Sequence, residues 1–183
     1  QSDVNSVNLS IYMGTFTFNK ITLAGTGTSN IFQFYDSGAI EELASTKSNA
    51  FTIAFQASTT YYFSKWSATG TSGNVITLAP ITGTTAYTLS FLNPQVSALN
   101  YISATYCAVS TTSRAEFYIG ANGTVGTGCT GSIIAAALPT PRTLYWVGGT
   151  GNWSDTTHWS TTSGSGSGAP VPTSFRSEEH TSE

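Results

Sequence analysis

Three carboxylates lie close together near the start of the chain, and paired carboxylates are the groups that a glycoside hydrolase uses. They are Asp36, Glu41 and Glu42, the only internal acidic cluster of the sequence. In glycosidases one carboxyl group protonates the leaving group while the other acts as nucleophile or base. The neighbouring residues here are Ser, Ala and Gly, and the other acidic residues are isolated. We therefore expect a solvated turn at this place and not a catalytic pair.

A histidine and an aspartate three residues apart, His158 and Asp155, could form an acid–base pair or contribute to a metal site. Two such residues are too few for a zinc site, which takes three or four protein ligands. We expect the imidazole to pack beside Trp153 and Trp159 instead. The sequence thus predicts no catalytic residue, no metal site and no cofactor, and we do not expect an enzyme.

The chain has two cysteines, Cys107 and Cys129, separated by 22 residues. A disulfide between them would contribute about 3 kcal/mol in the chain-entropy model. The alternative is a pair of small buried residues, because free cysteine is often buried. The sequence leaves both interpretations open.

Three tryptophans, Trp146, Trp153 and Trp159, lie close together and follow Tyr145. Exposed aromatic faces could form a platform on which sugar rings stack. The alternative is a plug that hides the apolar end of a repetitive fold, as the capping elements of repeat proteins do. We prefer the plug.

The composition excludes several classes of protein. Only 8% of the 183 residues are charged, and the net charge is −3, whereas about 25% of residues are charged in an average domain. The six Lys and Arg are scattered, so we predict no basic patch for nucleic acid. The sequence has no apolar run of about 18 residues, so no membrane-spanning helix is predicted.

Short segments rich in Thr, Ile, Val, Phe and Tyr recur over residues 1–138, with glycine-containing turn signals between them. Such segments predict β-strands. The predicted strands are residues 9–13, 15–23, 31–35, 51–55, 60–66, 75–78, 87–92, 101–107 and 116–119. One segment, Ser37–Lys47, has Ile40, Leu43 and Ala44 at helical spacing. It could equally be a strand and a turn.

A repeat links two of the predicted strands. Phe18–Thr26 aligns with Phe63–Thr71, and this offset of about 45 residues fits two coils of about 20–25 residues each. Each coil of such a stack buries its inward row on its neighbours. We therefore predict an all-β chain that forms a right-handed parallel β-helix, with Phe18 and Phe63 in one inward column. In this fold Cys107 and Cys129 would stack on neighbouring coils. A β-sandwich is the alternative, because it also has short strands at regular spacing.

The composition changes after the predicted coils, which span residues 1–138. Residues 139–144 contain two prolines and predict a stiff linker. Residues 145–175 form a module rich in Trp, Gly and Ser. The last eight residues, 176–183, are half charged and resemble the translation of a common short-read sequencing adapter. We treat this tail as not native, and the chain as a fragment from environmental sequence.

The tryptophan module resembles a segment of known repeat proteins. Trp146–Asp155, followed by His158–Ser160 and Val171–Thr173, is similar to the W-x-G-G-x-G-N-W-S segments of secreted or virion-associated β-helical repeat proteins of phages and environmental bacteria. There the segment opens a new β-helical block. Residues 51–78 and 117–123 resemble the closing coils of the block before it. Residues 128–132 depart from the usual closing pattern, because its Asn and Trp are absent.

The resemblance implies a structural function, as a repeat segment of a large extracellular or virion-surface fibre or adhesin. The expected partners are neighbouring repeats of the same chain, a cell-surface glycan, and a second copy that binds through exposed coil ends. The alternative is a carbohydrate-binding or polysaccharide-cleaving domain similar to a tailspike. In that case Trp146, Trp153 and Trp159 would be the sugar-stacking residues.

Overall fold

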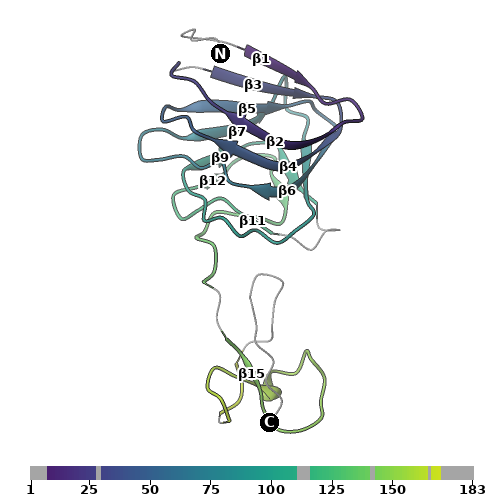
Figure 1. Cartoon of the computed structure of the whole chain (residues 1–183), viewed down its shortest axis with the longest axis vertical. Coiled ribbons are helices and arrows are strands. Elements are labelled where there is room, and N and C mark those ends of the chain that lie inside the picture. The colour runs from purple at the N-terminus through teal and green to yellow at the C-terminus, as the bar shows by residue number, and fades with distance from the viewer. Residues whose placement is uncertain (1–7, 28–29, 111–115, 141–142, 165, 170–183) are drawn as a thin grey trace. The chain divides into compact units, whose positions relative to one another are not determined.

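The computed structural model describes residues 8–27, 30–110, 116–140, 143–164 and 166–169 (Figure 1). The chain divides into two compact units, residues 1–138 and residues 139–183, and each unit has buried residues of its own. The tail 176–183 lies outside the described residues, as do Val171–Thr173 of the tryptophan module and residues 141–142 of the linker.

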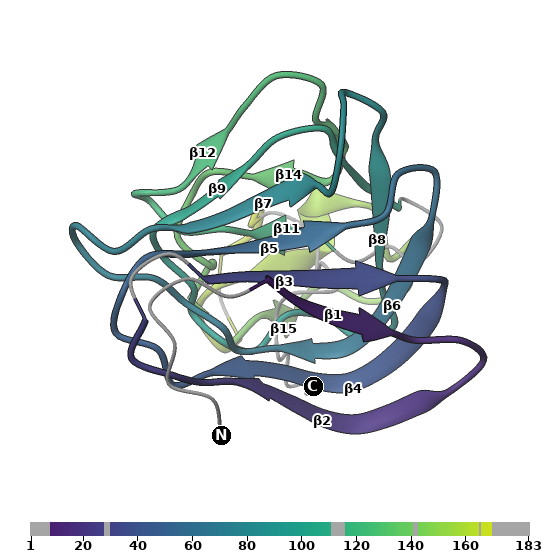
Figure 2. The same ribbon diagram turned by 90° about the horizontal axis from the view of Figure 1, so that it is seen from above.

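Residues 1–138 form a parallel β-solenoid of about five turns, in which successive strands alternate between two six-stranded sheets (Figure 2). The first sheet contains, in spatial order, β1 (Asn8–Tyr12), β3 (Asn30–Tyr35), β5 (Phe51–Phe55), β7 (Ile76–Pro80), β9 (Ile102–Ala104) and β12 (Thr124–Val125). The second contains β2 (Thr17–Leu23), β4 (Gly38–Ser45), β6 (Thr60–Trp66), β8 (Tyr87–Phe91), β10 (Cys107–Val109) and β13 (Thr130–Gly131). A short parallel pair, β11 (Phe117–Tyr118) and β14 (Ile133–Ile134), lies outside them.

This topology confirms the predicted parallel β-helix. It excludes the β-sandwich, because the two sheets of a sandwich are antiparallel. The length of a coil follows from the strand register: Tyr87 pairs with Cys107, 20 residues later, and Thr60 pairs with Thr88, 28 residues later. Some coils are therefore longer than predicted, because loops of different length connect the strands.

Each coil turns from the first sheet to the second at a residue in the left-handed conformation. These residues have φ between 50° and 73° and are Gly14, Asp36, Ser58, Gly83, Tyr106 and Gly128. At Gly128 a side chain also lacks room, because a Cβ there would overlap the ring of Tyr106 in the coil before. The prediction of a single strand over residues 101–107 was wrong, because a corner lies within this segment. The chain turns this corner at Tyr106, so the segment divides into β9 and β10 on different sheets.

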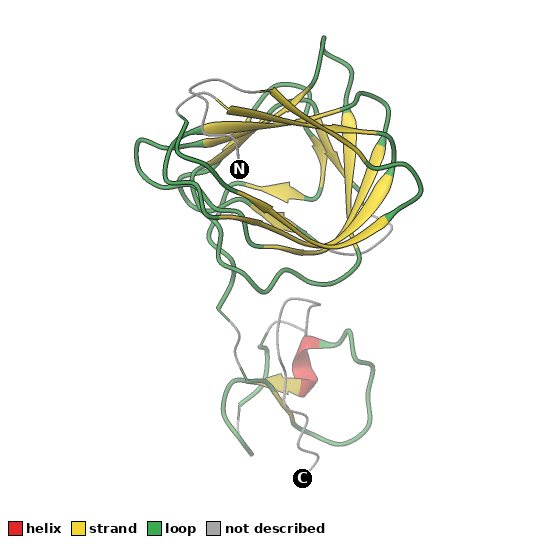
Figure 3. Cartoon of the chain, turned by 45° about the horizontal axis from the view of Figure 1, so that its top comes forward, coloured by secondary structure: helices red, strands yellow, loops and turns green. Residues whose placement is uncertain are grey.

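Inward side chains of successive coils stack in columns along the coil axis. Figure 3 shows the strands of the two sheets on the two sides of this interior. The ring of Phe55 stacks on Phe34, with centroids 5.5 Å apart, and on Tyr87 at 4.8 Å. On the second sheet the rings of Phe63 and Phe91 lie 5.8 Å apart. All five rings are buried. Aromatic pairs of this kind contribute about 0.5–1.5 kcal/mol beyond the burial of their area.

The sequence repeat marks one of these columns. Phe18 pairs with Ile40, and Ile40 pairs with Phe63. The two repeated phenylalanines therefore lie two coils apart in the same column, as predicted. Phe63 is fully buried, whereas Phe18, in the first coil, packs against the core but stays partly exposed.

The segment with helical spacing is the bent strand β4. Ile40 and Leu43 are buried, whereas Glu41 and Glu42 between them are not. Two successive residues outside the core allow the sheet to turn a corner, and they place the inward residues three positions apart. Phe63 and Trp66 of β6 show the same inward spacing. A bent strand thus imitates the periodicity of a helix.

Side-chain amides join the loops of successive coils. The backbone N–H of Asn100 donates to Thr69 Oγ1 at 2.8 Å, and the side-chain Oδ1 of Asn100 accepts from the Asn122 N–H at 2.9 Å. Gln95 binds the backbone of Tyr118 in the same manner, since its Oε1 accepts from the N–H at 2.8 Å and its Nε2 donates to the carbonyl at 2.9 Å. These bonds satisfy backbone groups that have no strand partner on that side.

Residues 139–183 contain an antiparallel hairpin made of β15 (Tyr145–Trp146) and β16 (Trp159–Ser160), with a 3-10 turn, η1 (Thr156–His158), before β16. Leu144 and Trp159 are buried. The second unit is therefore built around the predicted tryptophan module.

Candidate functional site

The acidic cluster of the sequence is divided in the structure between a corner and a bend. Asp36 occupies the left-handed corner before β4, where its backbone N–H donates to Gln56 Oε1 at 2.8 Å. Glu41 is exposed in the bend of β4. Glu42, its neighbour, has partners on both adjacent strands.

Glu42 lies between two lysines. Its carboxylate contacts Lys20 Nζ at 3.0 Å and Lys65 Nζ at 3.2 Å, and Ser67 Oγ donates to it at 2.8 Å. The pKa of Glu42 is lowered to about 2, first by the hydrogen bond from Lys20 and then by those from Ser67 and Lys65. A carboxyl group held ionised in this way cannot donate a proton at neutral pH. The arrangement fits a cross-strand ion pair better than a glycosidase acid.

Lys47 is a buried cation, held by main-chain oxygens. Its Nζ donates to the carbonyls of Gly25 and Gly27 at 3.1 and 2.9 Å and lies 5.8 Å from the centre of the Phe51 ring. Burial lowers the pKa of this lysine. These contacts close the loop after β2, which is a structural role.

The two cysteines lie in one column of adjacent coils, as predicted. Cys107 pairs with Tyr87, and Cys129 directly precedes Thr130, the partner of Ala108. Both are free thiols in the structure, and the disulfide remains one of the two interpretations that the sequence leaves open. Burial raises the pKa of Cys107 to about 12, and Cys129, only partly buried, donates its S–H to the Ala104 carbonyl at 3.3 Å. Cys107 therefore behaves as a small core residue.

The three tryptophans of the second unit form one cluster with His158. The rings of Trp146 and His158 stack with centroids 4.7 Å apart and planes 7° from parallel. Trp159 packs edge-on against Trp153 at 4.5 Å and against Trp146 at 5.2 Å. The histidine was predicted to pack beside Trp153 and Trp159, but its stacking partner is Trp146.

The loop between Trp146 and Trp153 explains the spacing of the motif. Trp146 Nε1 donates to the Gly149 carbonyl at 2.7 Å, and Trp159 Nε1 donates to the Trp153 carbonyl at 3.0 Å. A Cβ at Gly151 would overlap the imidazole of His158. Glycine at this position therefore lets the loop approach closely the ring on which Trp146 stacks.

Asp155 and His158 have structural partners. Asp155 Oδ1 accepts from the Thr157 N–H at 2.9 Å and from its hydroxyl at 2.7 Å. These hydrogen bonds, the backbone one first, lower the pKa of Asp155. His158 Nδ1 lies 3.2 Å from the Val147 carbonyl, and its Nε2 lies 4.0 Å from Asp155. Within the described residues no group of three or more His, Cys, Asp or Glu could hold a metal ion.

The three candidate sugar-stacking residues differ in exposure. Trp159 is buried and Trp146 is half-buried, whereas Trp153 is 52% exposed. Of the three, Trp153 alone has an extensive surface on which a ligand could lie.

A groove that sequence reasoning missed lies on the first sheet of the solenoid. Hydroxyl side chains follow one another in register on its outer face: Thr52, Thr77, Ser103 and Thr124. Beside them is an open groove of about 270 Å³, lined by Asn30, Ile31, Ala50, Phe51, Thr52, Val75 and Thr77. Its lining combines hydroxyls with apolar groups and has no charged side chain. The signal in the sequence was a Thr or Ser beside a buried residue, repeated once per coil.

No helix among the described residues is long and apolar enough to cross a membrane. No protein-family model, curated protein or solved structure matches the chain.

Proposed function

We propose that the chain is a structural repeat segment of a large fibre or adhesin, at the cell surface or on a virion. One observation carries this proposal, namely the unbroken in-register stack of coils with a continuous apolar interior. A stack of this kind adds length with each coil, because every coil buries its inward row on the next. Its natural partners are neighbouring repeats of the same kind.

Two further features support a structural function. Of the acidic residues that were candidates for chemistry, Glu42 pairs with Lys20 and Lys65. The outer face of the first sheet carries hydroxyls and small side chains. The resemblance of the tryptophan module to β-helical repeat proteins of phages and environmental bacteria agrees with an extracellular or virion location.

Limited proteolysis with a nonspecific protease tests the proposal. We expect the solenoid to survive as one fragment under conditions that degrade an ordinary domain, because a continuous stack has few local openings. Rapid cleavage within β3 to β10 would contradict it. A parallel assay measures reducing ends released from bacterial polysaccharides. If the unchanged protein released reducing ends and Glu41→Gln abolished this release, we would replace the structural function by a catalytic one.

Glycan binding is the second candidate, and the exposure of Trp153 favours it. A glycan array followed by calorimetry tests it with Trp153→Ala and with Tyr62→Ala as the control. Tyr62 is an exposed aromatic residue of the other unit. Loss of binding in Trp153→Ala alone, with the fold intact, would support a sugar-stacking site. No binding by the unchanged protein would exclude it for the glycans tested.

A further inference from the structure

The two cysteines follow the same corner in adjacent coils of the solenoid. Cys107 comes directly after a corner residue with φ of 50°, and Cys129 comes directly after one with φ of 73°. The residues that follow the cysteines, Ala108 and Thr130, are partners in the parallel pair of β10 and β13. The register of this pair therefore places Cys107 beside Cys129.

The spacing of parallel strands suits a covalent bond between these two residues. Neighbouring strands lie about 4.7–4.9 Å apart, and the Cα atoms of a disulfide are usually about 4.4–6.8 Å apart. Both side chains also lie on the inner side of their coils, because Cys107 is fully buried and Cys129 packs against the same apolar core. Two cysteines that are adjacent and on one face can be joined without a large movement of the backbone.

We propose that Cys107 and Cys129 form a disulfide when the folded protein meets a small-molecule disulfide such as oxidised glutathione. The structure then shows the reduced form, in which both residues are free thiols. The bond joins residues 22 positions apart, so it closes one coil of the solenoid. This inference does not depend on the proposed function.

The difference in exposure between the two thiols sets the order of the exchange steps. Cys129 is only partly buried, so its thiolate attacks one sulfur of oxidised glutathione, forms a mixed disulfide and releases one glutathione thiolate. Cys107 then loses its proton and attacks the Cys129 sulfur, which releases the second glutathione. Each released thiolate takes up a proton that a cysteine has lost, so two protein thiols are oxidised and one glutathione disulfide is reduced to two thiols. Burial raises the pKa of Cys107 to about 12, and the second step should therefore be the slow one at neutral pH.

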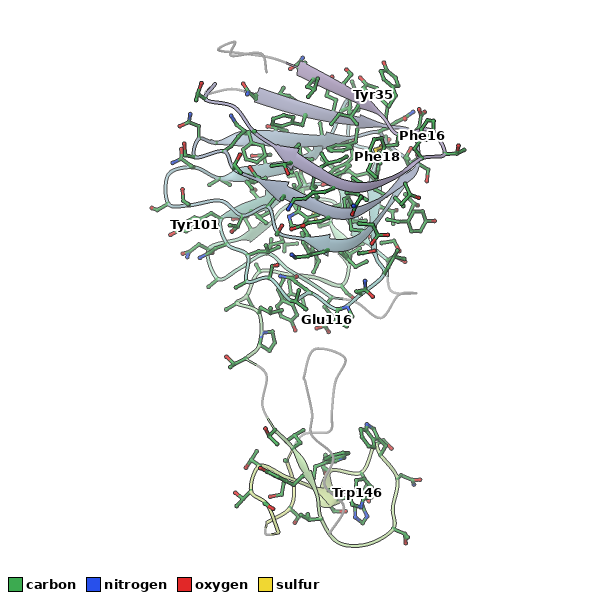
Figure 4. The ribbon with its side chains drawn as sticks, viewed as in Figure 1. Phe16, Phe18, Tyr35, Tyr101, Glu116 and Trp146 are labelled. Carbon is green, nitrogen blue, oxygen red and sulfur yellow. The ribbon has the colours of Figure 1, made fainter. Side chains whose placement is uncertain are left out.

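The bond lies in a part of the solenoid where backbone pairing is short. β10 and β13 pair at two positions, and so do β9 and β12, whereas β2 and β4 pair at six. Figure 4 labels Tyr101 and Glu116, between which the chain runs through β9 and β10, in the lower part of the solenoid. A disulfide stabilises chiefly by restricting the unfolded chain. It would thus strengthen a coil that few hydrogen bonds between strands hold in place.

Peptide mapping of the full 183-residue chain tests the proposal. The protein is equilibrated at low concentration in buffers of reduced and oxidised glutathione, quenched with acid and alkylated. We expect one intramolecular link between Cys107 and Cys129, with a mass lower by two hydrogens. At one glutathione ratio, the ratio of disulfide to dithiol should be higher in the folded protein than in urea by about tenfold or more, because the fold holds the two sulfurs together. An equal ratio in both states, or no link in the folded protein, would overturn the proposal.

Single substitutions test the order of the steps and the effect of the bond. Cys107→Ala should accumulate glutathione on Cys129, because no second thiol resolves the mixed disulfide. Cys129→Ala should stay unmodified while it is folded, since Cys107 is buried. The reverse pattern would contradict the proposed geometry. Oxidation should also raise the urea midpoint of the unchanged protein and leave that of Cys107→Ala where it was, and a midpoint that does not rise would contradict the stabilisation of the coil. If a variant misfolds, the mapping of the unchanged protein still decides.

Discussion

The two units use the same aromatic residues in different ways. In the solenoid the buried rings are spread over several coils, and rings of successive coils stack on one another, as Phe34, Phe55 and Tyr87 do. In the second unit four rings gather around one point, held by a hairpin with strands of two residues. The first arrangement spreads stability over many coils, whereas the second concentrates it in a few contacts.

The units also place the left-handed conformation differently. At the solenoid corners it occurs at Asp36, Ser58 and Tyr106 as well as at glycines. In the tryptophan loop it falls on Gly148 and Gly149. Tight coil packing can hold a non-glycine residue in this conformation, which costs about 1–2 kcal/mol per residue. The smaller unit relies on glycine, for which the conformation carries no such cost.

The largest effect is expected in the solenoid interior. Phe55 contacts rings in the coils on both sides, so Phe55→Ala leaves a cavity in the middle of a column. We expect the free energy of unfolding of the solenoid to fall by about 3–5 kcal/mol. Denaturant unfolding measures it. Val96→Ala, on an exposed loop, is the control and should change the free energy by about 0.5 kcal/mol or less. A small effect of Phe55→Ala would mean that the coils pack independently.

The second unit should depend as strongly on one tryptophan. Trp159 is buried between Trp146 and Trp153. Trp159→Ala should destabilise the hairpin by about 3–5 kcal/mol, whereas Trp153→Ala removes a half-exposed ring and should cost less. Residue-resolved hydrogen exchange separates the units. Loss of protection in β3 to β8 of Trp159→Ala would show that the stability of the solenoid depends on the second unit.

Sequence reasoning succeeded where a local pattern repeats. Phe18 and Phe63 were placed in one column because the same residues recur at two-coil spacing. Ile40, which lies between them, was missed as a member of this column. Two glutamates follow it in a bent strand, and its spacing to Leu43 matched a helix as well as a strand. Sequence period alone cannot distinguish a helix from a strand that turns a corner.

The candidate site was predicted less well, because it depends on contacts between distant parts of the loop. The tryptophans and His158 were chosen correctly as a cluster, but the stacking of His158 on Trp146 was not predicted. That contact requires the space that Gly151 leaves. Trp146 and Trp159 pair across the hairpin, whereas the exposed Trp153 lies in the loop between its strands. Composition contains no information on this difference.

Gly151 gives a sharper test of the aromatic cluster. In Gly151→Ala the new methyl group would overlap the His158 ring and push it from Trp146. We expect a loss of about 1–3 kcal/mol, the usual cost of overpacking. The control is the same substitution in a His158→Ala background, where the methyl group has room. A double-mutant cycle measures the difference, and equal costs in both backgrounds would show that the clash does not govern the position.

The smallest effect concerns the ion pairs on the outside of the solenoid and should depend on pH. Folding lowers the pKa of Glu42 from about 4.5 to about 2, because Lys20, Ser67 and Lys65 bind its carboxylate. The carboxylate therefore stabilises the fold above pH 4.5, and this contribution is lost as the pH falls towards 2. Glu42→Gln should melt below the unchanged protein at neutral pH, and the gap between their melting temperatures should close over that range. Glu41→Gln, at the exposed neighbouring position, should show no such pH-dependent difference in melting temperature.

If the difference in melting temperature between Glu42→Gln and the unchanged protein stayed constant with pH, the amide would be acting through packing at the bend, and the ion pairs would contribute nothing measurable. Exposed ion pairs often contribute little to stability, so either result would measure how much these outer ion pairs add to a solenoid stabilised mainly by its apolar interior.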